Sequence, residues 1–261
     1  MRSTGHKIGV AARAWNATDR YGVQVGANLP VFPLGTVLFP GLVLPLHIFE
    51  ERYRTLVRDL VARTGDGPHE FGVVTLRRGI EVPQAIEGGA EPPTTGPPVT
   101  AAQVYDVGCT AELRQVTELP DGRFDIVTVG RRRFTVLSIE SASAPYLNAE
   151  VDWLPEDEPA DPVTDLLAPR VLAAFRTYLD LLRPDTEVLD QVPDDPTVLS
   201  HLVAATAQLT TDERQMLLAA PDTVARLRAE LKLLNREAGL LARVRAVPVP
   251  LSDLARPASP N

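Results

Sequence analysis

The spacing of apolar residues changes character along the chain. From position 29 to position 153, short apolar runs alternate with segments rich in Gly, Pro and Asp, a pattern typical of strands joined by turns. The runs cover 29–34, 42–48, 71–76, 104–116, 124–129, 134–139 and 146–153. Asp121-Gly122 separates two of them and predicts a tight hairpin, because Gly tolerates the positive φ that such a turn needs. The order predicts a small closed or highly curved sheet.

One helix interrupts these strands early. Apolar residues between the second and third runs recur at helical spacing, and charged residues fill many of the remaining positions. The apolar positions are Phe49, Tyr53, Leu56, Val57 and Leu60. We expect this helix to end near Gly65. The prolines of the first two runs predict strand edges or ends, since Pro has no N–H to donate. The stretch 83–98, crowded with Pro, Gly and Thr, predicts a long loop.

After Trp153 the apolar period becomes helical. An acidic stretch, 155–159, precedes a helical stripe made of Leu172, Phe175, Leu179 and Leu182. Asp195-Pro196 predicts the start of a helix that reaches about Gln208, and the capping box Thr210–Glu213 predicts a short helix after it. A long last helix is predicted by the apolar seam of Val224, Leu227, Leu231, Leu234, Ala238 and Leu241.

The predicted fold class is α+β, with four segments in chain order. Residues 1–28 have no sustained period and are expected to be an extension, and residues 29–154 form the β part. Residues 155–247 form a helical subdomain, and residues 248–261 form a tail that carries four prolines. The long helix packs either within the chain or across a dimer, and intramolecular packing is the simpler expectation.

Composition predicts a cytoplasmic globular protein. A chain of 261 residues with 44% hydrophobic content is long enough to bury a substantial core. The single cysteine, Cys109, excludes an intrachain disulfide, and a reducing compartment fits this usage. Charged residues and prolines interrupt every apolar run before it reaches the roughly 20 residues of a membrane span. The first 26 residues also lack the apolar core of a secretory signal.

The charge distribution argues against nucleic acid as a partner. Residues 1–28 hold four basic and one acidic residue, which gives +3. Residues 29–154 hold 11 basic and 16 acidic residues, or −5, and residues 155–261 hold 11 and 17, or −6. Proteins that bind nucleic acid normally concentrate positive charge to neutralise phosphates, and neither folded part does so.

Several separated motifs resemble the substrate-binding domain of Lon proteases. The opening Leu29-Pro-Val-Phe-Pro-Leu-Gly-Thr-Val-Leu-Phe-Pro-Gly41 leads into Leu44-Pro-Leu-His-Ile-Phe-Glu-Glu-Arg-Tyr-Arg54, and this pair is the most specific part. Shorter matches are Val107-Gly-Cys-Thr-Ala-Glu-Leu113, Leu119-Pro-Asp-Gly-Arg123, Val129-Gly-Arg-Arg-Arg-Phe134 and Asp212-Glu-Arg-Gln-Met-Leu-Leu218 with Arg226-Leu227. The resemblance runs from about Leu29 to Arg245. The first 28 residues and the length of the loop 83–98 have no counterpart in the family pattern.

The resemblance implies a PUA-like pseudo β-barrel of about six strands with one early helix, followed by an α-helical bundle that ends in a long helix. It also implies a module that binds protein or peptide, as an adaptor or client-binding protein in protein quality control. In Lon proteases an ATPase and a peptidase follow this domain, whereas this chain stops, so we expect a stand-alone member.

The two lysines fit neither catalytic function of a Lon protease. ATP hydrolysis needs the phosphate loop G-x-x-x-x-G-K-[ST], but Lys7 precedes Ile8 and Lys232 precedes Leu233. Lon's peptide hydrolysis uses a serine nucleophile with a desolvated lysine base. Lys232 lies beside the seam of a charged helix, and Lys7 lies in the expected extension. We therefore expect no enzymatic activity and no cofactor.

No other chemistry stands out among the residues. The four histidines, His6, His47, His69 and His201, are scattered without the spacing of a metal site. Cys109 follows a glycine in a strand and is expected to be a small buried residue. PUA-like folds elsewhere bind RNA, so the triplet Arg131–Arg133 keeps an RNA-binding module as the alternative. The simpler interpretation is a solvated hairpin whose arginines pair with nearby carboxylates, since base-stacking aromatic residues are not interleaved there.

With catalysis set aside, recognition of other proteins is the predicted function. The expected partners are exposed hydrophobic segments of client proteins, or a protease, and no membrane. The candidate binding surface comprises Phe32, Leu38, Phe39, Leu42, Leu44, Phe49 and Tyr53. Some of the seven must belong to the core, and Phe39 and Leu42 are the first candidates for exposure because a turn lies between them.

Overall fold

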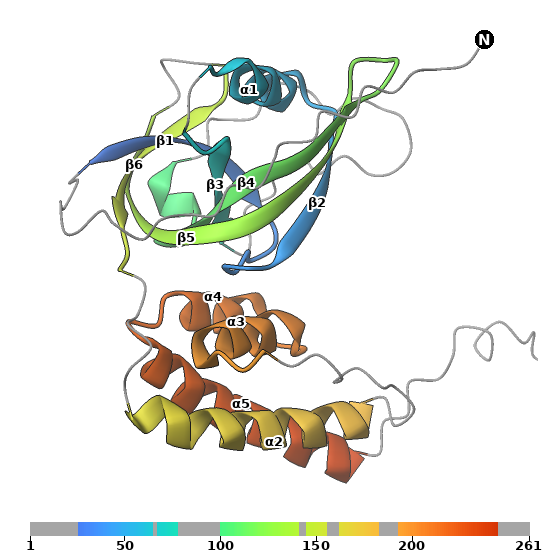
Figure 1. Ribbon diagram of the computed structural model, residues 1–261, viewed down its shortest axis with the longest axis vertical. Helices are drawn as coiled ribbons and strands as arrows, with labels where there is room; N and C mark the ends of the chain where they lie inside the picture. The colour runs from blue at the N-terminus through green and yellow to red at the C-terminus, as the bar shows by residue number, and fades with distance from the viewer. Residues whose placement is uncertain are drawn as a thin grey trace, which may run out of the picture.

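Six strands in the first half of the chain form one sheet that closes on itself (Figure 1). The computed structural model describes residues 26–64, 67–77, 100–140, 145–155, 162–182 and 193–244. The strands are β1 (Ala27–Leu34), β2 (Val43–Ile48), β3 (Glu70–Thr75), β4 (Val107–Glu118), β5 (Phe124–Glu140) and β6 (Leu147–Trp153). Their order is β2-β5-β4-β3-β1-β6, and β5 also pairs with β6. Five strands therefore close a barrel, and β2 is attached to β5 outside the ring.

Helix α1 (Glu51–Ala62) covers one end of the barrel (Figure 1), and a short 3₁₀ helix, Ala101–Gln103, precedes β4. The predicted hairpin between β4 and β5 is confirmed, because Gly122 has a φ of 79°. Most of the predicted extension, the loop 83–98, nearly all of the acidic stretch and the tail lie outside the described residues.

Strand β5 is longer than the apolar pattern indicates. The runs 124–129 and 134–139 were expected to be separate strands, but they belong to one 17-residue strand. Its first half pairs with β2 and its second half with β6, and a register shift between β4 and β5 lies near the middle. The four polar or small residues 130–133 belong to the strand because Gly130 and Arg133 pair with Ala111 and Cys109 of β4, and the β2 and β6 ladders lie directly before and after them.

The prolines of β1 lie where the strand has a neighbour on one side only. Pro30 falls in the segment that pairs with β6, and Pro33 falls in the segment that pairs with β3. Each missing N–H is therefore compatible with the ladder, although β1 as a whole is not an edge strand. Pro45 does lie on an edge, since β2 pairs with β5 alone among the described strands.

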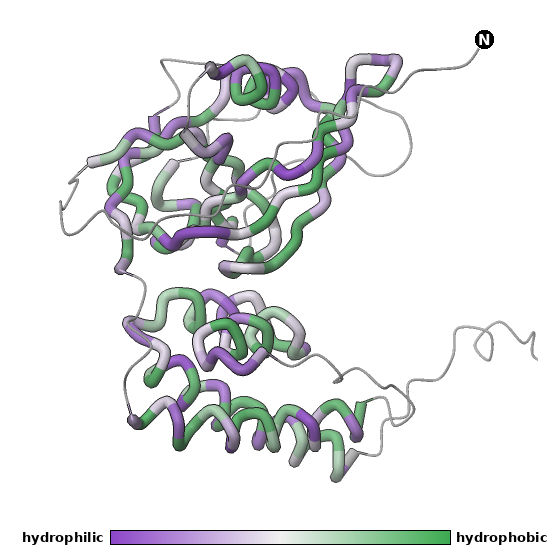
Figure 2. The backbone as a smooth tube through the Cα atoms, in the orientation of Figure 1, coloured by the Kyte–Doolittle hydropathy of each residue, from purple (hydrophilic) through white to green (hydrophobic). Residues whose placement is uncertain are grey.

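Four helices form the second half: α2 (Pro162–Leu182), α3 (Pro196–Thr206), α4 (Thr211–Leu218) and α5 (Thr223–Val244). In Figure 1, α3 and α4 lie between the barrel and the long pair α2 and α5. Figure 2 shows apolar and polar residues interspersed along these helices, as amphipathic packing requires. Both predicted caps are confirmed: the Asp195 carboxylate accepts from the N–H of Thr197 at 2.8 Å, and Thr210 forms its capping box with Glu213.

The two halves share an apolar core. One cluster of buried side chains fills the α1 end of the barrel and includes Leu56, Phe71 and Ile126. The same cluster continues into Leu217 and Leu218 of α4. Two further clusters lie inside the barrel next to β6 and among the helices. The barrel and the helices are therefore packed against one another rather than joined only by the chain.

Candidate functional site

Three of the seven residues predicted for a binding surface are buried. Leu38 is 4% exposed, Phe39 1% and Tyr53 3%. The expectation that Phe39 is exposed is therefore wrong. Its loop is held flat on β5, because the N–H of Gly41 donates to the carbonyl of Gly130 and the N–H of Gly130 donates to the carbonyl of Leu42, both at 2.8 Å. Helix α3 contributes His201, whose ring lies near that of Phe39.

The close approach at Gly130 explains how the loop reaches this position. A Cβ built on Gly130 would lie 2.9 Å from the carbonyl carbon of Phe39 and closer still to its oxygen. Only glycine leaves room for the loop backbone at this point of β5. The Phe39 ring then lies 6.1 Å from the ring of His201, measured between centroids. Phe39 is thus part of the junction between barrel and helices.

The other four predicted residues are half-buried. Phe32 stacks on Tyr53 with 3.8 Å between ring centroids, and the Arg52 guanidinium lies 4.6 Å above the Tyr53 ring. Burial raises the pKa of the Tyr53 hydroxyl. Leu42 and Leu44 pack against the edge of the shared core, and Phe49 lies beside His47. Phe32, Leu42 and Leu44 therefore pack mainly against the core.

A different surface is presented by the part of the sheet that extends beyond the barrel. We call it the arm and define it as Val43–Ile48 of β2, Phe124–Val129 of β5 and Leu113–Glu118 of β4. Strand β3 pairs with β4 only as far as Glu112. From Leu113 onward, the neighbour of β4 within the described sheet is β5 alone. The arm is therefore a three-stranded antiparallel sheet with an edge on β2 and another on β4.

One face of the arm is exposed and holds a hollow of about 370 Å³. Val43, at the end of this face, is 61% exposed. The register places Val127 between Pro45 and Gln115, and His47 beside Asp125. The sequence of β2 indicates this face, because successive side chains of a strand point to opposite faces. Leu44 and Leu46 point inward, so the side chains of the odd-numbered residues point outward. The hollow is lined by Pro45, Leu46, His47, Gln115, Thr117, Asp125, Ile126 and Val127.

The polar groups of this face satisfy one another. His47 Nδ1 lies 2.6 Å from an Asp125 carboxylate oxygen, and an Arg123 guanidinium nitrogen lies 3.3 Å from His47 Nε2. Arg123 also binds Asp121 at 2.6 Å, and this pairing lowers the pKa of the Asp121 carboxyl. His47 is therefore a surface residue of the arm, with a side chain that is 45% exposed.

A second hollow, of about 230 Å³, lies at the β4 edge of the arm next to the end of α1. Its walls are mainly apolar and come from Val61, which is 41% exposed, with Leu113 and Val116. We call it the Val61 hollow. Its remaining lining residues are Arg63, His69, Arg114 and Gln115. The Nδ1 atom of His69 lies 2.5 Å from the carbonyl oxygen of Leu60. Because a carbonyl oxygen can only accept a hydrogen bond, this nitrogen carries a proton.

The arginine triplet is committed to contacts within the protein. Arg131 pairs with Glu112 at 2.9 Å, and Arg132 pairs with Glu70 at 2.7 Å while lying 3.8 Å above the Trp153 ring. Arg133 is 1% exposed. Its guanidinium donates to the carbonyls of Leu218 at 3.0 Å, Ala220 at 2.6 Å and Pro155 at 3.2 Å. This arginine therefore joins the barrel to the end of α4.

Two titratable groups are buried near this junction. Burial, together with the positive charges of Arg226 and Arg133, lowers the pKa of His201 to about 2. Burial raises the pKa of Glu230 well above its ordinary value, although Arg226 opposes the shift. Cys109 is buried, as predicted. Among the described residues, no three His, Cys, Asp or Glu side chains come together in a way that could hold a metal ion.

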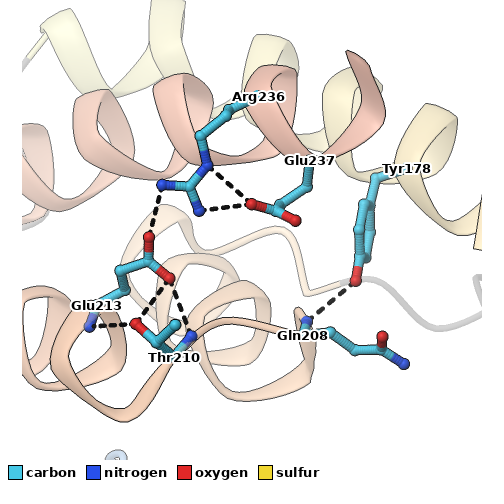
Figure 3. Close-up of polar contacts among 6 residues, drawn as sticks. All are labelled: Tyr178, Gln208, Thr210, Glu213, Arg236 and Glu237. Carbon is cyan, nitrogen blue, oxygen red and sulfur yellow. Dashed lines mark hydrogen bonds and ion pairs between the residues drawn. The ribbon is translucent and has the colours of Figure 1, made fainter. Parts of the chain in front are cut away.

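Polar contacts also tie the helices to one another (Figure 3). Glu213 completes the cap of α4 and binds Arg236 of α5 at 2.6 Å, which lowers the pKa of the Glu213 carboxyl to about 2. Tyr178 of α2 accepts the N–H of Gln208 at 3.0 Å. Arg236 also binds Glu237. These contacts tie α4 to α5 and the segment after α3 to α2.

Comparison with known proteins identifies the family. Residues 28–236 match the model of the ATP-dependent protease La (LON) substrate-binding domain. The Lon protease of Anaeromyxobacter dehalogenans is 30% identical over 84% of this chain, and Lon protease 1 of Thermus thermophilus is 36% identical over 51% of it. The matched region is 24% of the first relative and 17% of the second, so the chain spans about a quarter or less of their length.

Solved structures agree on the fold. The N-terminal domain of a Mycobacterium avium complex Lon protease superposes with a TM-score of 0.56 at 21% identity, covering 80% of this chain and 98% of that domain. A Lon N-terminal domain protein from Xanthomonas campestris gives 0.54 at 24% identity. The predicted α+β fold class is confirmed. In the described part of the chain, the helices are too short or too polar to cross a membrane. The chain belongs to the LON substrate-binding domain family.

Proposed function

We propose that this chain is a non-catalytic module that recognises exposed hydrophobic segments of other proteins. The observation that carries the proposal is the Val61 hollow, an apolar surface cavity with positively charged groups at its margin. Solvent-exposed apolar cavities of this kind are typical of interaction sites. The family description, a substrate-binding domain, supports the same function. Clients of protein quality control and a protease partner are the two candidate classes of binding protein.

The described residues offer little support for catalysis. Lys232, the lysine in the described part of the chain, is exposed on α5 and therefore lacks the desolvation that a lysine base requires. The buried titratable residues His201 and Glu230 lie in the packed junction rather than in a cleft. On the exposed face of the arm, His47 already contacts Asp125 and Arg123. Recognition without bond cleavage is the function that these features support best.

A permanently unfolded polypeptide tests the proposal. Reduced, carboxymethylated α-lactalbumin labelled with a fluorophore should bind the protein, and Val61→Asp should weaken the binding about tenfold, because it places a charge in the apolar wall. Val43→Asp is the matched control, since Val43 is exposed on the opposite edge of the arm. Both variants should keep the wild-type melting temperature within a few degrees.

Two results would reject the proposal. The wild-type protein could fail to bind the unfolded polypeptide, or Val61→Asp and Val43→Asp could bind as tightly as the wild type. Turnover of the polypeptide, with or without ATP, would contradict the non-catalytic part.

RNA binding gains no comparable support. The triplet Arg131–Arg133 is engaged by Glu112, by Glu70 with Trp153, and by backbone carbonyls. Arginines that already hold carboxylates within the fold would have to release them to bind phosphates. A salt-dependent gel shift with RNA near physiological ionic strength would favour this alternative over ours.

A further inference from the structure

Within the described residues, the β4 edge of the arm has backbone groups that no strand pairs, and they lie next to an apolar hollow. We propose that an extended segment of a partner protein adds as a strand to this edge, placing an apolar side chain in the Val61 hollow and a neighbouring acidic side chain near its arginines. This inference rests on the proposed function and specifies its binding mode and the chemistry of the segment.

Hydrogen bonding in the hairpin shows which groups of β4 are open. The N–H of Leu119 donates to the carbonyl of Arg123 at 2.8 Å, so the backbone of Leu119 faces β5. Backbone direction alternates along a strand, and the N–H and C=O groups of Val116 and Glu118 therefore point away from β5. No other strand of the described sheet pairs with these residues. They form a short template for an added strand.

The groups before this template are already engaged. The N–H of Leu113 donates to the carbonyl of His69 at 2.9 Å, and strand β3 occupies the edge as far as Glu112. A register shift follows between Leu113 and Gln115. An added segment would therefore begin where β3 ends and continue the sheet toward the hairpin. The Val61 hollow lies at that starting point, because Leu113, Arg114 and Val116 all line it.

The other edge of the arm is a poorer template. In β2, the carbonyl of Leu42 accepts from Gly130 of β5, so the even-numbered residues face β5 and the odd-numbered residues face outward. Pro45 is one of the outward residues and has no N–H to donate to a new strand. Proline at such a position commonly protects a sheet edge from pairing. The β4 edge lacks this protection between Arg114 and Glu118.

The charge around the hollow selects the segment. Arg63 and Arg114 line the hollow, and Arg131 lies close by because it shares Glu112 with Arg114 at 2.9 and 3.2 Å. Asp59, one helical turn before Arg63, is bound by the Tyr146 hydroxyl at 3.0 Å.

The guanidinium groups of Arg63, Arg114 and Arg131 outnumber the carboxylates of Asp59 and Glu112. The margin of the hollow is therefore positive, although the net charge of the chain is −8. A partner carboxylate is therefore favoured beside the apolar side chain. Glu118, farther along the same edge toward the hairpin, disfavours acidic residues at that end.

A synthetic peptide tests the binding mode directly. The probe is a short alternating Thr/Val peptide with a central Leu flanked on one side by two Asp residues, and binding is measured by isothermal titration. Two peptide controls keep the protein unchanged: one replaces both Asp with Lys, and one carries N-methyl groups on the amides that would pair with β4. Each should bind about tenfold more weakly, through lost charge pairing or lost backbone hydrogen bonds.

Protein variants and amide exchange localise the contact. Val116→Pro removes one outward N–H of the β4 edge and should weaken peptide binding about tenfold, whereas Val43→Pro, at an outward position of the β2 edge, should leave binding unchanged. In the wild-type protein, the peptide should slow hydrogen exchange of the Val116 and Glu118 amides but not of the Val43 amide.

The outcomes separate this inference from the proposed function. If the peptide binds but the N-methylated form binds equally well, and the Val116 and Glu118 amides stay unprotected, strand addition is wrong while recognition of hydrophobic segments stands. If the Lys peptide binds as well as the Asp peptide, the proposed charge selection is wrong. If neither the peptide nor the unfolded polypeptide binds the wild-type protein, both proposals fail.

Discussion

Replacing Phe39 by Ala tests whether this residue belongs to the junction or to a binding surface. The side chain is 1% exposed, so truncation removes nearly all of a buried aromatic ring and leaves a cavity between β5 and α3. Phe→Ala substitutions in packed cores cost about 3–5 kcal/mol. Domains are typically stable by about 5–15 kcal/mol, so the variant would lose a large fraction of its free energy of unfolding.

The loss should be visible in thermal and chemical unfolding. Each kcal/mol shifts the melting temperature by about 2–4 °C for a protein of this size, so Phe39→Ala should melt roughly 6–20 °C below the wild type. Far-UV circular dichroism during heating and guanidinium titration measures both quantities. Val43→Ala is the control, because Val43 is 61% exposed and its truncation should change the free energy of unfolding by less than about 0.5 kcal/mol.

The opposite result would refute the placement of Phe39. If Phe39→Ala melted with the wild type while binding of an unfolded polypeptide fell, the ring would be a surface contact. The packing of the loop on Gly130 and under α3 would then be wrong.

Three further substitutions, together with the control Gly239→Ala, test the junction and its surroundings. Gly130→Ala should destabilise the protein by about 1–3 kcal/mol, because its Cβ would overlap the Phe39 carbonyl. Gly239→Ala, in a helix with open space around it, should instead stabilise the protein by about 0.5–1 kcal/mol. Denaturant titrations that give the same sign of change at both positions would contradict the close approach of the loop to Gly130. His201 has a folded-state pKa of about 2 against an ordinary 6.5, so its contribution to stability is complete above pH 6.5 and is lost as the pH falls. The wild type should therefore lose up to about 1.4 kcal/mol per pH unit relative to His201→Leu, and parallel stability curves between pH 7 and pH 5 would count against a neutral buried imidazole. Arg133→Met should lower the free energy of unfolding by about 2–4 kcal/mol and speed proteolysis near α4, because the carbonyls of Leu218 and Ala220 lose a charged donor. Unchanged proteolysis would show that Arg133 does not join the two halves.

Features set by neighbours in sequence could be predicted. Asp195 and Thr210 cap helices through bonds to backbone groups two or three residues away, so the residue types alone indicate the helix starts. Gly122 acts within a single turn. The overall order of strands and helices follows from the change of apolar period after Trp153. The motifs that resemble Lon proteases lie on these same elements.

Features set by distant residues could not be predicted. Phe39 looks like an exposed turn residue because the residues that bury it, on β5 and α3, are far away in the sequence. The binding potential of β4 depends on where β3 stops pairing, and no local pattern marks Glu112 as that point. Val61 lies on a helix whose apolar stripe faces the core, and its exposure matters only because the open part of the β4 edge begins beside it.

The shared core has a consequence for how this protein can be divided. Leu217 and Leu218 of α4 belong to the same buried cluster as Leu56 of α1, although a long stretch of chain separates them. A fragment cut after Trp153 would leave Phe39 and its neighbours facing water, and such a fragment is expected to aggregate. The smallest piece suitable for grafting onto another protein therefore includes both the strands and the helices.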